Sequence, residues 1–148
     1  MANPVKTLFL RSIKEAIAEI SSIKTVIRNP TKPIDRETVP FPVCFIFDGA
    51  EENEDRNLIN LKTFELHIEV WVCDPNGDEA ISDAAESIQS EIIGKITDNP
   101  DLYKYGLNLK ELGANKFFAG EDLGGIIMRF KAQYAHKRGD PTDPARGK

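Results

Sequence analysis

The sequence has few of the residues from which catalytic and metal sites are usually built. It contains two histidines, two cysteines and one tryptophan in 148 residues. The histidines, His67 and His136, lie far apart, and neither belongs to an HExxH motif or another metal-ligand spacing. The phosphate-binding motifs GxGxxG and GxxxxGK[ST] do not occur. We therefore expect a protein that is not an enzyme and that needs no metal and no cofactor.

Long apolar runs are also missing. No segment approaches the ~20 apolar residues of a membrane-spanning helix, and charged residues from Lys6 onward interrupt the N-terminal segment, unlike a signal peptide. We expect no membrane association and a cytoplasmic protein. Cys44 and Cys73 lie in apolar strand contexts, so we expect two buried, reduced thiols.

Basic residues are fewer than acidic ones, with 19 Lys and Arg against 24 Asp and Glu. The net charge is −5 and the pI is about 5.1. Non-specific binding to duplex DNA requires clustered Lys and Arg that displace counterions. The net negative charge argues against such binding. It permits a surface past which DNA slides without sticking.

What the sequence does contain is strong alternation of apolar and polar residues. In NLKTFELHIEVWV, Asn60–Val72, Phe64 and every second residue after it are apolar, which predicts a strand with one buried face. GGIIMRFKAQYAH, Gly124–His136, alternates in the same way. VCFIFDG, Val43–Gly49, is apolar throughout, as in a strand buried on both faces. We expect it to form an antiparallel hairpin with the first of these strands, joined by the acidic loop AEENEDRN, 50–57.

Two segments have helical periodicity. Apolar residues recur at three- and four-residue steps over about Pro4–Ile20 and Asp78–Thr97. The remaining strand candidates are IKTVIR (23–28), LNLKELG (107–113) and KFFAGED (116–122). This order predicts an α+β fold in which two amphipathic helices pack on one face of a mostly antiparallel, mixed sheet of about five strands. We expect a single domain over 1–136 and a flexible C-terminal tail over 137–148.

The polar face of the strand Asn60–Val72 has two interpretations. Glu65, His67 and Glu69 are typical of a solvated sheet face, where they would pair with Arg129 and Lys131 of the last strand. The same three residues would be the acid, base and imidazole of a small enzyme, provided that a concave pocket surrounded them.

Trp71 stands on the same predicted face. An aromatic residue among charges often marks a contact surface, since aromatics and arginine are enriched at protein interfaces. The alternative is that this tryptophan lies under the N-terminal helix.

The order of these segments resembles a known family. FPVCFIFDGAEE, ELHIEVWV and YKYGLNLKELGANKFFAGEDLGGIIMRFKAQYAH follow a short amphipathic helix and a proline-rich stretch. Together they are similar to the phage tail terminators, the U-type minor tail proteins of long-tailed phages. The similarity runs from the first helix to about His136, and the proline-rich arm and the end of the chain go beyond the family pattern.

The resemblance implies a structural role in a virion, encoded by a phage or a prophage. Tail terminators form a hexameric ring of identical subunits on the head-proximal end of the tail tube. The ring stops tube elongation and offers a surface to the head connector, while DNA passes through it without specific binding. The implied partners are therefore further copies of this chain, the tail tube protein and a neck protein, met in the host cytoplasm during assembly. Another neck component, such as a tail-completion or head–tail joining protein, is the alternative within the same class.

A ring requires two different contact patches on each subunit. Exposed charges and the single tryptophan are our candidates for these contacts. They are Arg36 and Glu37 in the proline-rich arm, Glu51, Glu52, Glu54, Asp55 and Arg56 in the predicted acidic loop, Trp71, and Lys137 and Arg138 near the C-terminus.

Overall fold

The fold is an α+β arrangement built on one mixed sheet. The computed structural model describes residues 2–31 and 37–145. Five strands lie in the order β1-β2-β3-β5-β4. They are β1 (Thr25–Arg28), β2 (Val43–Arg56), β3 (Ile59–Cys73), β4 (Gly106–Phe118) and β5 (Leu123–Lys137). Only the β1–β2 pairing is parallel among the four pairings of this sheet, so the predicted mostly antiparallel sheet is confirmed.

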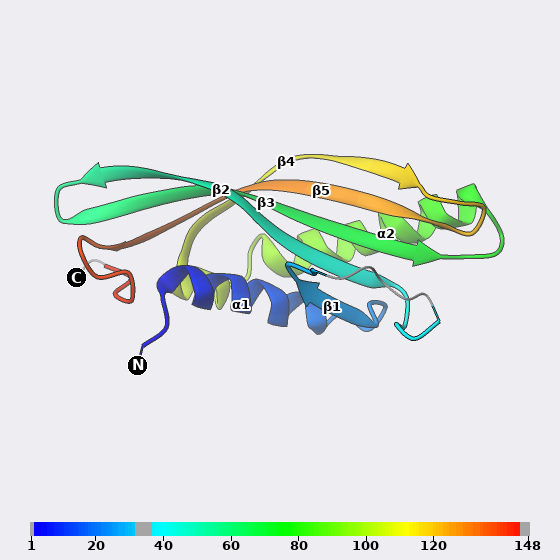
Figure 1. Ribbon diagram of the computed structural model, residues 1–148, viewed down its shortest axis with the longest axis horizontal. Helices are drawn as coiled ribbons and strands as arrows, with labels where there is room; N and C mark the ends of the chain where they lie inside the picture. The colour runs from blue at the N-terminus through cyan, green and yellow to red at the C-terminus, as the bar shows by residue number, and fades with distance from the viewer. Residues whose placement is uncertain (1, 32–36, 146–148) are drawn as a thin grey trace.

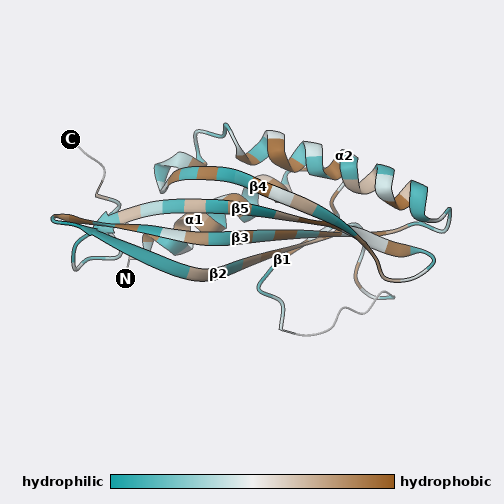
Figure 2. Ribbon diagram, turned by 90° about the horizontal axis from the view of Figure 1, so that it is seen from above, coloured by the Kyte–Doolittle hydropathy of each residue, from teal (hydrophilic) through white to brown (hydrophobic). Residues whose placement is uncertain are grey.

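Both long helices lie on the same face of the sheet (Figure 1). They are α1 (Val5–Ala18) and α2 (Asp78–Ile96), and a short 3₁₀ turn, η1 (Leu102–Lys104), follows α2. Each helix buries an apolar stripe against the strands, as the periodicity predicts. No helix in the described ranges is long and apolar enough to cross a membrane. The opposite side of the sheet carries no helix, as the view from above also shows (Figure 2). We call it the open face.

The core lies between the sheet and the helices. Alternate side chains of β3, from Phe64 to Val72, are buried on this side, as the sequence predicts. They are opposite the buried alternate side chains of β5, including Met128 and Phe130. From α1, Phe9 meets Phe64 edge to face with ring centroids 6.3 Å apart.

The acidic segment after residue 49 is a strand, so the prediction of a loop there is wrong. β2 continues to Arg56, and only Asn57 and Leu58 connect it to β3. An irregularity between Asp48 and Glu51 precedes regular pairing with β3 that ends at Arg56 opposite Ile59. This part of the hairpin projects beyond α1, so both of its faces meet solvent and charged residues are tolerated there (Figure 1).

Two further expectations are corrected. The segments around Gly113 form one strand, β4, whose pairing with β5 is irregular near Glu111–Gly113 and at its start. A bulge thus interrupts the alternation without ending the strand. Cys44 is buried as expected, but Cys73 is exposed because it points to the open face at the end of β3, and no disulfide joins the two.

Backbone hydrogen bonds continue past residue 136, the end that we expect for the domain. β5 ends at Lys137. The Arg138 N–H then donates to the Leu58 carbonyl (3.0 Å), and the Val5 N–H donates to the Pro141 carbonyl (2.9 Å). The segment after β5 therefore contacts both the β2–β3 turn and the start of α1. The flexibility of the chain end stays a prediction.

Candidate interaction surface

The register of the sheet places the polar side chains of β3 on the open face. Glu65 is opposite Lys131 of β5, and His67 is opposite Arg129. The register therefore confirms the prediction that Glu65 and His67 lie beside the cations of β5. Directly opposite residues on one face of an antiparallel pair lie close enough to interact.

The three residues proposed for an enzyme are arranged along a flat strand. His67 Nε2 is 2.8 Å from Glu65 Oε1, and their side chains are 42% and 46% exposed. Glu69 Oε1 instead accepts a hydrogen bond from Trp71 Nε1 at 3.1 Å. The hollow that includes Glu65 includes neither His67 nor Glu69. Partly exposed side chains at alternate positions on one sheet face suit a contact surface better than a catalytic site, which is usually concave.

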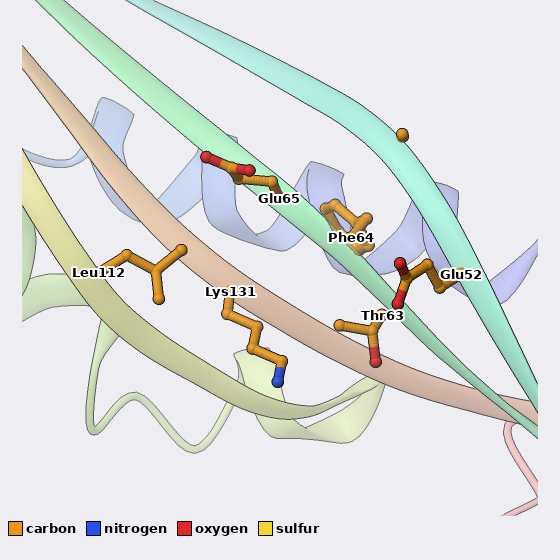
Figure 3. Close-up of a pocket in the computed structure, with 7 residues that line it drawn as sticks. Glu52, Thr63, Phe64, Glu65, Leu112 and Lys131 are labelled. Atoms are coloured by element: carbon orange, nitrogen blue, oxygen red, sulfur yellow. The ribbon is translucent and has the colours of Figure 1, made fainter.

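A shallow hollow of about 290 Å³ lies on the open face. Four strands contribute to its rim: Glu52 comes from β2, Glu65 from β3, Lys131 from β5 and Leu112 from β4 (Figure 3). Leu112 is 46% exposed although it is a large apolar side chain. The hollow therefore combines an apolar residue with carboxylates on one side and an ammonium group on the other.

Trp71 lies on the open face, so the alternative position under the N-terminal helix is excluded. Its ring meets that of Phe117 of β4 with centroids 4.7 Å apart. Both residues are opposite Gly125 of β5, the strand between β3 and β4. Because glycine has no side chain, the two rings meet above β5. A Cβ at Gly125 would lie 3.0 Å from the Phe117 ring and only 1.7 Å from the Val70 carbonyl oxygen.

The structure brings the candidate residues of the hairpin and the chain end together. Asp55 and Arg138 form an ion pair with a 3.7 Å separation, and Arg56 Nε lies 2.8 Å from Glu54 Oε2. All four side chains are about half exposed or more. Leu58, at the tip between them, is 77% exposed. Lys137 is exposed at the end of β5.

Glu51 belongs to a different cluster, on the helix side of the sheet. The Tyr134 hydroxyl donates a 2.7 Å hydrogen bond to it, and Lys6 of α1 lies 3.4 Å away. Lys6 also pairs with Asp48 at 3.3 Å. Burial raises the pKa of Asp48, but a hydrogen bond from Asn29 and the charges of Lys6 and Arg28 outweigh it, so the pKa is lowered. Burial and the bond to Glu51 raise the pKa of Tyr134.

The arm candidates are only partly described. Arg36 lies outside the described residues. Glu37 is exposed at the start of the second described range. The end of the arm returns to the sheet, where the Thr25 hydroxyl donates to the Pro40 carbonyl (2.8 Å). Trp71 stands at the end of β3 away from the hairpin tip, so the candidates do not form one patch.

Several residues of the open face are absent from the contacts that the sequence predicts. Lys110 and Lys131 are directly opposite each other on β4 and β5, and Leu112 and Phe117 lie on the same face. The alternation of β5 already assigns Lys131 to the polar face. The positions of the β4 residues depend on strand register and a bulge, which the sequence did not reveal. In the described ranges, no group of three or more His, Cys, Asp or Glu side chains is placed to hold a metal ion.

Comparison with known proteins identifies a similar fold. A chain from the virion of a native gene transfer agent (GTA) particle superposes with a TM-score of 0.51 and 12% sequence identity. The match covers 88% of this chain and 93% of that chain. No protein-family model and no curated protein matches the sequence. The likeness extends over nearly the whole fold and, at this identity, concerns the fold alone.

Proposed function

We propose that this chain is a structural protein of a phage-like virion, and specifically a tail terminator. The observation that carries the proposal is the fold likeness to a chain of a gene transfer agent virion, which spans most of both chains. The specific assignment as a tail terminator rests on the sequence resemblance to that family. In this role the protein forms a hexameric ring on the head-proximal end of the tail tube and has no catalytic activity.

The surface chemistry is compatible with such a role. The sheet leaves one broad face without a helix, and that face carries charges, exposed Leu112 and the Trp71–Phe117 pair. Aromatic anchors among polar groups are typical of protein contacts. The net charge of −5 also disfavours binding to the DNA that passes through the ring.

The projecting part of the β2–β3 hairpin offers a second contact region. It extends beyond α1 and ends in exposed Leu58 (Figure 1). Neighbouring ion pairs join Asp55 to Arg138 and Glu54 to Arg56. A ring subunit has to contact its neighbours and, separately, the tube and the neck protein. We assign the hairpin tip to the tube or neck contact.

The test is a tube-elongation assay with the tail tube protein of the same phage or prophage. Tubes are grown from a fixed number of initiators with increasing amounts of this protein, and their lengths are measured by electron microscopy. The proposal predicts that elongation stops at one protein ring per tube. A charge-preserving tip variant, Leu58→Asp with Asp55→Asn, should cap less effectively, while Lys104→Gln in η1 should cap normally.

Unchanged tube lengths at saturating protein would refute the terminator assignment. Binding to the head connector in the absence of tubes, together with unchanged tube growth, would instead identify a head–tail joining protein. Both outcomes are read in the same experiment if purified connector is included in a parallel pull-down.

A further inference from the structure

The charges of the open face are divided between its two halves. Four carboxylates lie on β2 and β3, and we call them the acidic half: Glu52, Glu54, Glu65 and Glu69. Arg56 of β2 lies on the same face and pairs with Glu54. Three cations lie beside them on β5 and β4, and we call them the basic half: Lys110, Arg129 and Lys131. A further cation, Lys137, lies at the hairpin end of β5. The division follows the boundary between β3 and β5 along the sheet. One face of a single subunit thus presents both signs side by side.

The cations of the basic half are not held in close ion pairs by the described residues. None of its three cations forms an ion pair with another residue of the described ranges. Lys110 and Lys131 are directly opposite each other, an arrangement of like charges that disfavours the isolated sheet. Carboxylates from another molecule would remove this repulsion.

An apolar anchor lies on β4, within the basic half. Leu112 is 46% exposed on the rim of the hollow, close to Lys131 and across from Glu52 (Figure 3). Interfaces combine such a central apolar contact with complementary charges around it. The hollow can therefore receive a side chain from a partner whose own surface is acidic.

We infer that the partner is a second copy of this chain, whose acidic half docks on the basic half of its neighbour. The acidic half supplies the charge that the basic half lacks, so the complementarity is already present within one sequence. Because both halves lie on one face, this docking brings the two open faces together, and the acidic half of each copy meets the basic half of the other in a two-fold pair. The inference goes beyond the proposed function, because a face-to-face pair of two copies is a contact separate from the neighbour contacts of the ring.

The test uses charge reversal followed by mixing. One variant, Glu52→Lys with Glu54→Lys, leaves the acidic half with two lysines and two carboxylates, and a second, Lys110→Glu with Lys131→Glu, leaves the basic half with two carboxylates and one cation. The matched controls reverse exposed helical charges away from the open face: Glu15→Lys with Asp83→Lys, and Lys14→Glu with Lys104→Glu. Circular dichroism verifies that every variant is folded before association is compared.

Sedimentation equilibrium at about 50 and about 500 mM salt measures association, because screening weakens surface charge pairs. We expect the wild-type protein and both controls to associate, more weakly at high salt. Each open-face variant alone should associate at least about tenfold more weakly, and an equimolar mixture of the two should recover association. Recovery on mixing distinguishes this contact from a general loss of stability.

The inference is overturned if the wild-type protein stays monomeric at every concentration, if the variants associate normally, or if mixing does not restore association. These failures are separable from failure of the proposed function. A monomer that still stops tube growth would refute the interface alone. Pairs that obey the charge-reversal pattern, in a protein that never caps a tube, would refute the terminator assignment alone.

Discussion

The start of β4 packs closely against α1, where Gly106 lies next to the ring of Phe9. Gly106 is buried, and a Cβ placed there would lie 2.2 to 2.7 Å from three atoms of the Phe9 ring. Phe9 is fully buried and its ring packs on Phe64, so it cannot swing into solvent. The Gly106→Ala variant should therefore force a shift of α1 or of β4.

The magnitude follows from two opposing effects. Overpacking a close-packed core costs up to about 3 kcal/mol. Replacing glycine by alanine within a strand returns up to about 1 kcal/mol of conformational entropy. We expect Gly106→Ala to lower the free energy of unfolding by about 2 kcal/mol, which moves a urea midpoint by about 1 M for a typical slope.

The assay is urea unfolding followed by circular dichroism, with two further variants. In a Phe9→Leu background the ring atoms nearest to the new methyl group are gone, so the added cost of Gly106→Ala should fall by about 1 kcal/mol or more. Gly94→Ala is the control, since nothing lies within 4 Å of its new Cβ. In the last turn of α2 it should stabilise by up to about 1 kcal/mol. An unchanged midpoint for Gly106→Ala, or an equal cost in both backgrounds, would refute the packing.

Three more predictions concern single groups. Asp48→Asn should lower the free energy of unfolding by about 1 to 2 kcal/mol at neutral pH. The pKa of Asp48 is lower in the folded protein than in the unfolded chain, where it is about 3.9. The extra stability of the wild-type protein over the variant should therefore be complete above pH 3.9 and vanish as the pH falls through the folded pKa. Urea titrations across acidic pH would detect this loss. Tyr134→Phe should cost about 1 kcal/mol through the lost bond to Glu51, measured by the same unfolding assay, and a Glu51→Gln background should diminish that cost. A thiol reagent near pH 8 should modify exposed Cys73 rapidly and reach Cys44, whose pKa burial raises to about 12, only in denaturant; equal rates for both thiols would contradict the described packing.

Much of the fold could be predicted because alternation reports burial on one side. The apolar residues of β3 and β5 identify both strands and the side on which the helices lie. The continuation of β2 could not be predicted in this way. From Glu51 to Arg56 no apolar alternation remains, since the hairpin projects beyond α1 and neither face is buried. Hairpin pairing with β3 across the turn at Asn57 and Leu58 maintains the strand there.

The candidate surface was harder to predict than the fold. The polar face of β3 and the two cations of β5 follow from alternation alone. The meeting of Trp71 with Phe117 depends on the register of β4 and on Gly125 in the strand between them. A one-residue slip would have placed Phe117 on the opposite side of the sheet. The divided charge of the open face becomes visible only when β2, β3, β5 and β4 are placed side by side.

The most direct test of the proposed role is to image tail tubes that have been mixed with the purified protein. Cryo-electron microscopy of the tube ends would show whether the chain binds there and with which symmetry. If the chain is a tail terminator, a six-fold ring of this fold should lie on one end of each tube, with the other end bare. Tubes with both ends bare at saturating protein, or protein bound along their sides, would contradict that assignment.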